Sequence, residues 1–122
     1  MLSTTEILIK AKELLNKPNG YVKHKLADGM GGYCALGACL AAGHQAQTGA
    51  NVSTSGDCLS MTFLPAYTKA NMLLARVSPL PFRANIVGYN NHPARTVEEM
   101  NQVFCKAIEI AAEEEANEQA TD

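Results

Sequence analysis

A run of small residues between Gly31 and Ala42 limits what this chain can fold into more than any other segment. After its tyrosine the run has little side-chain bulk, since it reads Gly-Gly-Tyr-Cys-Ala-Leu-Gly-Ala-Cys-Leu-Ala-Ala. It predicts a thin helix over 34–42 that ends at Gly43 as its cap. Gly37 inside that helix costs about 1 kcal/mol of helix propensity relative to alanine, which a close backbone crossing there would offset. We expect this helix to lie at the domain centre, enclosed by the helix at the carboxyl end.

Three other segments have apolar residues at the period of an amphipathic helix. They cover residues 4–16, 63–76 and 97–115. Each presents one apolar stripe and must bury it against another element. Two of them follow a capping box, in which a hydroxyl residue and a glutamate bond reciprocally across the helix start: Ser3 with Glu6, and Thr96 with Glu99.

The remaining segments are predicted to be extended or irregular. Residues 21–33 contain an Asp-Gly turn signal and predict a short hairpin or an extended loop. Residues 84–89 are predicted to be a short extended piece, and 90–93 a turn. The polar stretch 44–58 predicts a long loop, and loops of that length in compact domains are typically functional or mobile.

The fold class that follows is mainly α, an α-rich α+β domain in which about four helices form a compact bundle with one small hairpin or extended element. A chain of 122 residues, of which 47% are hydrophobic, is long enough for one domain with a well-filled core. We expect residues 1–115 to form this single globular domain. Residues 116–122 are predicted to be an acidic tail in which the last helix frays.

Composition argues against several classes of function. The net charge of −2 gives no general electrostatic attraction for nucleic acid. No apolar run reaches the roughly 18 residues of a membrane span, and the start of the chain lacks the basic residues and cleavage site of a signal peptide. We therefore expect a cytoplasmic protein that neither enters a membrane nor binds nucleic acid.

The cysteines do not have the spacing of a zinc site, and no phosphate-loop or dinucleotide fingerprint occurs. The sequence therefore predicts no metal and no cofactor. In the cytoplasm all four thiols would be reduced, and buried, unreactive side chains are expected for the second and the fourth of them. The four cysteines are Cys34, Cys39, Cys58 and Cys105.

The charges are distributed unevenly along the chain. Lysines are concentrated in the first 25 residues, and acidic residues are concentrated after residue 97. Such runs usually form solvated helix faces. The alternatives are a head-to-tail contact between subunits, which would make the protein a homo-oligomer, or a basic patch that takes a phosphate-bearing ligand.

Cys34 allows two interpretations. At the start of the small-residue helix its thiol lies at the positive end of the helix dipole, which favours the thiolate, and His92 on a later loop would serve as its base in a cysteine hydrolase. However, no glutamine precedes Cys34 to supply an oxyanion donor, and no acidic residue follows closely after His92 to orient it. The alternative is a buried, structural thiol inside a tightly packed helix.

The densest polar cluster comprises Asn90, Asn91, His92, Arg95 and Thr96, at the start of the last predicted helix. Free backbone N–H groups and the helix dipole make such a start suitable for an anion, and Arg95 would add a bidentate donor. The alternative is an Asx turn followed by a helix cap, which needs no ligand.

Four aromatic residues, Tyr21, Tyr33, Phe82 and Tyr89, fall in or beside predicted loops. They would line a pocket and stack on a base or ring if the protein binds such a ligand. The alternative is that they close the ends of a small core. Tyr33, Phe82 and Tyr89 accordingly join the polar cluster as candidate ligand-binding residues.

Several short motifs occur in order along the chain: Tyr33-Cys34-Ala35-Leu36-Gly37-Ala38, then Val87-Gly88-Tyr89-Asn90-Asn91, Thr96 and Lys106-Ala107-Ile108. Together they resemble a small family of uncharacterised proteins from bacteriophages and actinobacteria, which carry an aromatic-Cys-Ala-Leu-Gly-Ala segment and a later aromatic-Asn-Asp pattern. The likeness excludes residues 44–60 and the acidic tail, and Asn91 stands where the family has aspartate. The resemblance implies a phage origin and no particular activity.

These features predict a small binding protein in preference to an enzyme. We expect a phage-type protein that modulates a host process by binding a host protein or a small anionic, nucleotide-like ligand. The alternative function is a cysteine-dependent hydrolase that uses Cys34 and His92.

Overall fold

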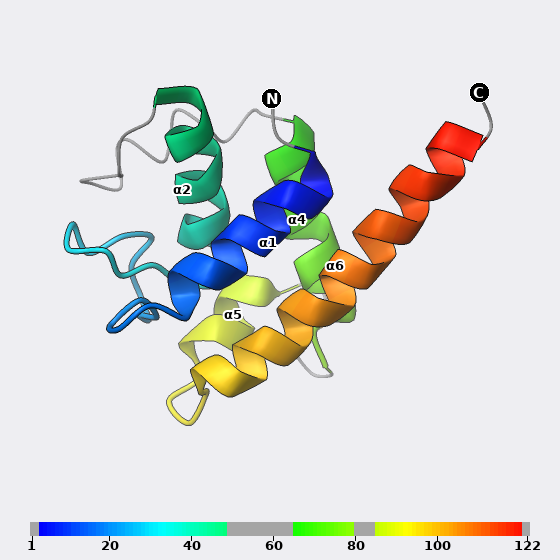
Figure 1. The fold of residues 1–122 in the computed structure, drawn as a ribbon. Helices are drawn as coiled ribbons and strands as arrows, with labels where there is room; N and C mark the ends of the chain where they lie inside the picture. The colour runs from blue at the N-terminus through cyan, green and yellow to red at the C-terminus, as the bar shows by residue number, and fades with distance from the viewer. Residues whose placement is uncertain (1–2, 49–64, 80–84, 121–122) are drawn as a thin grey trace.

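The computed structural model describes residues 3–48, 65–79 and 85–120, and within these ranges the chain forms five helices and no strand (Figure 1). The predicted mainly α fold is confirmed. Some of the predictions fall outside the described residues, namely those on Phe82, on Cys58 and on the 49–58 part of the predicted loop. The helices are α1 (Thr4–Leu15), α2 (Ala35–Thr48), α4 (Pro65–Val77), α5 (Ile86–Asn91) and α6 (Val97–Ala120).

Helix α1 forms where the sequence predicts it. The Ser3 hydroxyl accepts the Glu6 N–H at 3.2 Å, and the Glu6 carboxylate accepts the Ser3 N–H at 3.0 Å, which completes the predicted capping box. The apolar stripe of the helix is buried throughout. Its members are Ile7, Leu8, Ala11, Leu14 and Leu15.

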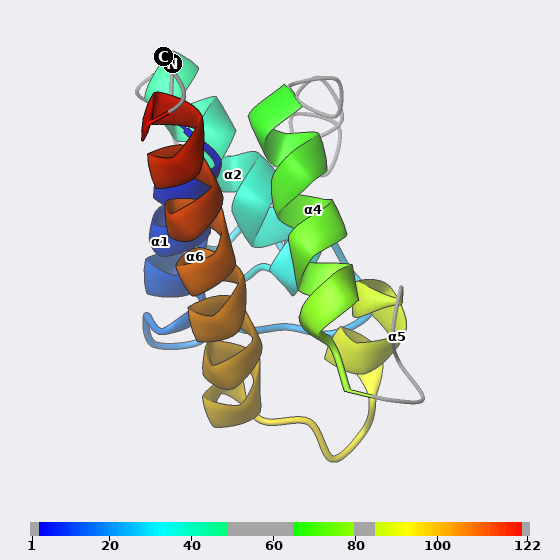
Figure 2. The ribbon, with the colours of Figure 1, turned by 90° about the vertical axis from the view of Figure 1, so that its right-hand side faces the viewer.

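Helix α1 lies at the centre of the bundle and contacts α2, α4 and α6. Figures 1 and 2 show α1 and α6 running side by side, with α4 packed across both. The expectation that α6 encloses α2 is wrong. Each of these two helices packs mainly on α1 and α4, because the stripes of α1 and α4 are wide enough to bury both.

Helix α2 begins one residue after its predicted start and continues through the predicted cap at Gly43 to Thr48. Gly43 is buried inside the helix. Its propensity cost of about 1 kcal/mol is outweighed by packing, since burial of one leucine side chain alone contributes about 2 kcal/mol. Within α2 the residues from Ala38 to Ala42 are all buried.

The extended piece predicted at 84–89 is wrong where the structure describes it, because Ile86–Asn91 is the short helix α5. Asn85 starts it by accepting the Gly88 N–H with its side chain at 2.9 Å. A brief apolar run has too few residues to distinguish the helical period from the strand period, and the asparagine cap decides between them. The turn predicted at 90–93 lies two residues later, over 92–95, where the Arg95 N–H donates to the His92 carbonyl at 2.9 Å.

Helix α6 starts as predicted, since Thr96 and Glu99 form the expected capping box. It runs to Ala120 instead of fraying from Glu113. Four contacts with other helices hold its acidic end. Lys69 of α4 pairs with Glu114 at 3.0 Å and Glu118 at 3.6 Å, Arg76 of α4 pairs with Glu114 at 3.3 Å, and Glu115 accepts the Thr5 N–H at 3.1 Å.

The segment between α1 and α2, residues 16–34, folds back on itself as an extended loop. Its Asp-Gly turn is closed by the Asp28 carboxylate, which accepts the N–H groups of Met30 and Gly32 at 2.8 Å each. Tyr33 makes isolated bridges to both Tyr21 and Ala27. The predicted hairpin or extended element is therefore an ordered loop with isolated bridges.

Candidate functional site

The candidate site begins where the 16–34 loop crosses the first turn of α2. At Gly37 a Cβ atom would overlap the carbonyl oxygen of Leu26, so only glycine permits this approach. His24 precedes the crossing in the left-handed conformation, with φ at 66°. The close crossing expected at Gly37 is confirmed, and its partner is a loop segment.

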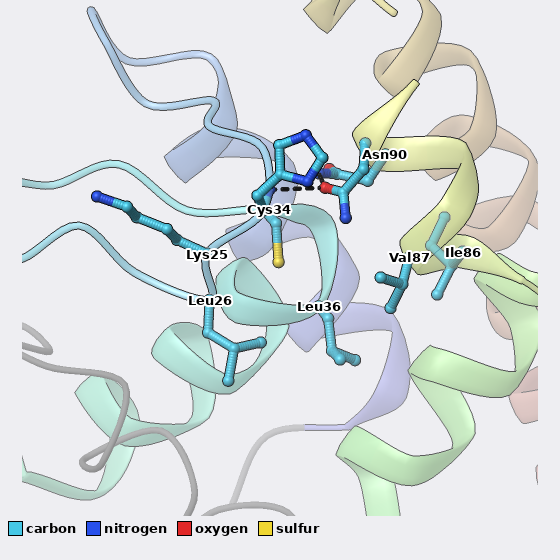
Figure 3. A pocket seen from close by; sticks show the side chains of 9 residues that line it. Lys25, Leu26, Cys34, Leu36, Ile86, Val87 and Asn90 are labelled. Atoms are coloured by element: carbon cyan, nitrogen blue, oxygen red, sulfur yellow. Dashed lines mark hydrogen bonds between the residues drawn. The ribbon is translucent and has the colours of Figure 1, made fainter. Parts of the chain in front are cut away.

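A pocket of about 280 Å³ lies beside this crossing (Figure 3). The 16–34 loop, the start of α2 and helix α5 form its walls. Figure 3 shows the Cys34 sulfur directed into the space between Leu26 and Leu36. We call it the Cys34 pocket, and its lining residues are His24, Lys25, Leu26, Cys34, Leu36, Ile86, Val87, Asn90 and Asn91.

Asn90 joins the three walls of the pocket. Its side chain is 1% exposed, and its Oδ1 accepts the N–H of Ala35 at 2.9 Å, which caps α2 from outside the helix. Its Nδ2 donates to the Val22 carbonyl at 3.2 Å, while its own backbone carbonyl accepts the Tyr21 hydroxyl at 2.6 Å. Burial raises the pKa of Tyr21 to about 12, so this hydroxyl remains a donor at neutral pH.

Cys34 occupies the position immediately before α2. Its Sγ accepts the Gly37 N–H at 3.3 Å and its carbonyl accepts the Ala38 N–H at 2.8 Å. Burial raises the pKa of the Cys34 thiol, and this effect exceeds the lowering by the helix-start N–H groups. The protonated thiol acts as a helix cap, as the structural interpretation of Cys34 requires.

We predict that Cys34 reacts slowly with iodoacetamide near neutral pH. A raised pKa leaves a smaller thiolate fraction than in a free cysteine, so its rate should be at least about tenfold below that of exposed Cys105 on α6. Peptide mass spectrometry after timed labelling measures both rates, and labelling in guanidinium should make them similar. Fast labelling of Cys34 in the folded protein would contradict this assignment.

The other cysteines differ in burial. Cys39 is fully buried in α2, as expected, and burial raises the pKa of its thiol further still. Cys105 was expected to be buried and is exposed. It lies immediately after Phe104 on α6, so it falls just outside the stripe that faces the core.

The predicted anion site at the start of α6 contains a carboxylate of the chain itself. Glu99 Oε1 accepts the Thr96 N–H at 3.1 Å, and its Oε2 accepts from Arg95 Nη1 at 2.9 Å. Arg95 also donates from Nε to the Tyr89 carbonyl and lies 3.6 Å from the centre of the Tyr89 ring. The hydrogen bond from the Thr96 N–H makes the largest contribution to lowering the pKa of Glu99, and the positive charge of Arg95 lowers it further. An anion at this place would have to displace Glu99.

Two of the candidate aromatic residues belong to the core. Tyr33 is 2% exposed and Tyr89 is 4% exposed, so neither ring face is open to a ligand. Phe82, the third candidate, is outside the described residues. His92 is exposed at the end of α5, accepts the Ala94 N–H on its Nδ1 at 3.2 Å, and is not among the residues that line the Cys34 pocket.

Within the described residues no cluster of three or more His, Cys, Asp or Glu side chains is placed to hold a metal ion. None of the described helices has an apolar stretch of the length that crossing a membrane requires.

Comparison with known proteins identifies the family. The model of the family of unknown function DUF6197 matches residues 1–110. The chain belongs to this family. The resemblance to an uncharacterised domain family is thereby confirmed. This DUF6197 chain matches no curated protein and no solved structure.

In the DUF6197 chain, three candidates from the sequence meet at one pocket: Cys34, Asn90 and Asn91. Arg95, Thr96 and Glu99 form a separate group at the start of α6. Of the six other lining residues, Lys25 belongs to the lysine run that the sequence offered as a possible basic patch, and the other five were not predicted. Gly37 signalled that some segment would cross α2, but its position in the sequence did not identify residues 24–26 as that segment.

Proposed function

We propose that the protein is a non-catalytic binding protein that holds a small molecule in the Cys34 pocket. The observation that supports this proposal most directly is the lining of the pocket, in which apolar side chains remain open to solvent beside polar groups. Val87 on α5 is 48% exposed although it lines the same pocket as the apolar residues Leu26 and Leu36 of the other two walls. Concave, mostly apolar surfaces with a few polar groups are typical of ligand sites.

The size of the pocket favours a small ligand. Its volume of about 280 Å³ lies just below the roughly 300 to 1,000 Å³ that is typical of small-molecule sites. Such a volume suits a metabolite that is smaller than a nucleotide. The crossing at Gly37 and the bonds of Asn90 hold two of the walls in place, which reduces the ordering that a ligand would have to impose.

A cysteine hydrolase has less support. The Cys34 thiol has a raised pKa, whereas a nucleophilic cysteine needs a lowered one. His92, the base expected from the sequence, does not line the pocket. A protonated, buried thiol suits a wall of a binding pocket better than a nucleophile.

We place this binding function inside a bacterial cell, on the resemblance to phage and actinobacterial proteins. There a phage-encoded protein would modulate a host process, either through the small ligand or through a host protein that senses the ligand-bound form. The uneven charges along the chain are compatible with a homo-oligomer, which light scattering would detect.

The binding proposal is tested by calorimetric titration with three probes that share an eight-carbon chain: octanoate, octanol and octylammonium. We predict that at least one of them binds with saturation at one site per chain. The variant Val87→Trp places a large ring in the pocket and should abolish that binding. Met72→Trp is the matched control, since Met72 is 65% exposed on α4 and lies outside the pocket. Failure of all three probes to bind would refute the proposal.

A further inference from the structure

We infer that the ligand of the Cys34 pocket is a small amphiphilic anion, with a carboxylate or phosphate head and a short apolar body. This inference rests on the proposed binding function and adds the chemical class of the ligand. It depends on which polar atoms of the pocket residues remain unused after the internal hydrogen bonds are made.

The hydrogen bonds of Asn91 determine whether the open edge of the pocket, its rim, offers a ligand donors or acceptors. Its Oδ1 accepts the backbone N–H of His24 at 2.8 Å and the Asn90 Nδ2 at 3.0 Å. A backbone N–H can only donate, so the atom that faces it must be the amide oxygen and not the nitrogen. The oxygen is therefore used internally, and Asn91 has only its NH₂ group left for a ligand. Among the described residues no acceptor bonds to that group.

The other polar residues of the pocket also favour an anion. Lys25 carries a positive charge, and Figure 3 shows its ammonium extended outward at the pocket edge on a flexible stem that can fold back. His24 is exposed at the same rim and can donate from its ring. None of the nine lining residues is acidic, so nothing in the lining repels a negative head.

The start of α2 does not supply the donors for this head. Two of its first three N–H groups already have partners, since Ala35 donates to Asn90 Oδ1, and Gly37 to Cys34 Sγ. The head is therefore assigned to the rim formed by Asn91, His24 and Lys25. The body would lie on the apolar wall, where Leu36 and Val87 are accessible.

The same eight-carbon probes, with octyl phosphate added as a fourth, test this inference, because they differ only in the head group. We expect octanoate or octyl phosphate to bind at least about tenfold more tightly than octanol, and octylammonium to bind least. Comparing the two anions distinguishes a carboxylate ligand from a phosphate ligand. Acetate and inorganic phosphate, which lack the body, should bind much more weakly than the octyl anions.

Asn91→Asp is the decisive variant. Aspartate still accepts the His24 and Asn90 bonds with one oxygen, but it replaces the outward NH₂ by a second carboxylate oxygen. Octanoate affinity should fall about tenfold or more, and octylammonium should now bind better than octanoate. Asn85→Asp is the matched control: it adds the same charge to the other end of α5 and keeps the cap of Gly88, so octanoate affinity should change less than about twofold.

The outcomes separate the two proposals. If octanol binds the wild type as tightly as octanoate, and Val87→Trp abolishes both, the pocket is a ligand site but the anion assignment is wrong. An unchanged octanoate affinity in a folded Asn91→Asp protein also overturns the assignment. Should this variant fail to fold, Lys25→Glu reverses a fully solvated rim charge instead and should weaken octanoate in low salt.

Discussion

Gly37→Ala should be the most damaging single-methyl substitution in the described part of this protein. The new Cβ would overlap the carbonyl oxygen and carbon of Leu26, and backbone atoms cannot move aside as a flexible side chain can. Overpacking typically costs about 1–3 kcal/mol, and an overlap with rigid backbone atoms lies at the upper end, at about 3 kcal/mol, against a gain of about 1 kcal/mol in helix propensity. We expect a net loss of about 2 kcal/mol and, because the crossing forms the pocket, weaker binding of the octyl probes.

Urea unfolding followed by circular dichroism measures this loss. Gly88→Ala is the matched control, because Gly88 is also a helical glycine but its nearest neighbours are side-chain atoms of exposed Asn85. The control displaces the Asn85 cap, which costs about 1 kcal/mol, but the gain of about 1 kcal/mol in helix propensity largely offsets this, so the net loss should stay below about 1 kcal/mol. Equal losses at the two glycines would show that the Leu26 crossing is not the reason for Gly37.

Asn90→Ala should have an effect of similar size for a different reason. The substitution leaves two groups without their partners, the N–H of Ala35 and the carbonyl of Val22. A buried unpaired group costs about 1–3 kcal/mol. The bond to Ala35 is buried and the bond to Val22 is part-buried, so we expect a total loss of about 3 kcal/mol in the free energy of unfolding. Thermal denaturation should show a fall of roughly 10 °C.

Asn101→Ala is the matched control for Asn90→Ala. Asn101 also bonds to another chain segment, through Asn16 at 2.9 Å, but this pair lies at the surface where water replaces it. Its loss should stay below about 0.5 kcal/mol. Asn90→Asp separates the two bonds, since aspartate still accepts from Ala35 but cannot donate to Val22. An unchanged stability of Asn90→Ala would contradict the role assigned to this residue.

The parts of the fold that local chemistry determines were predictable from the sequence. The capping boxes at Ser3 and Thr96 fixed the starts of α1 and α6, because the bonds involved join residues three apart. The end of α6 was not predictable, since it depends on Lys69 from another helix. Helix α5 was missed because its six residues include too few apolar ones to show a decisive period.

The candidate site was predictable in part. Cys34, Asn90 and Asn91 were selected for their chemistry, and the fold brings them together. His24 was not selected, and Lys25 was considered only as one of the lysines of a possible basic patch, because their place depends on a left-handed residue and on the passage of the loop across Gly37. Arg95 was predicted to bind an anion. Glu99, only four positions later, pairs with it and neutralises its charge, but from the sequence Glu99 was interpreted as a helix cap alone.

Titration of the ¹⁵N-labelled protein with octanoate, followed by two-dimensional NMR, tests binding at the Cys34 pocket most directly. The backbone amides of Leu26, Leu36 and Val87 and the side-chain NH₂ of Asn91 should shift together and saturate with a single dissociation constant. If these four signals do not shift and the signals of residues around Arg95 shift instead, the assignment of the site is contradicted.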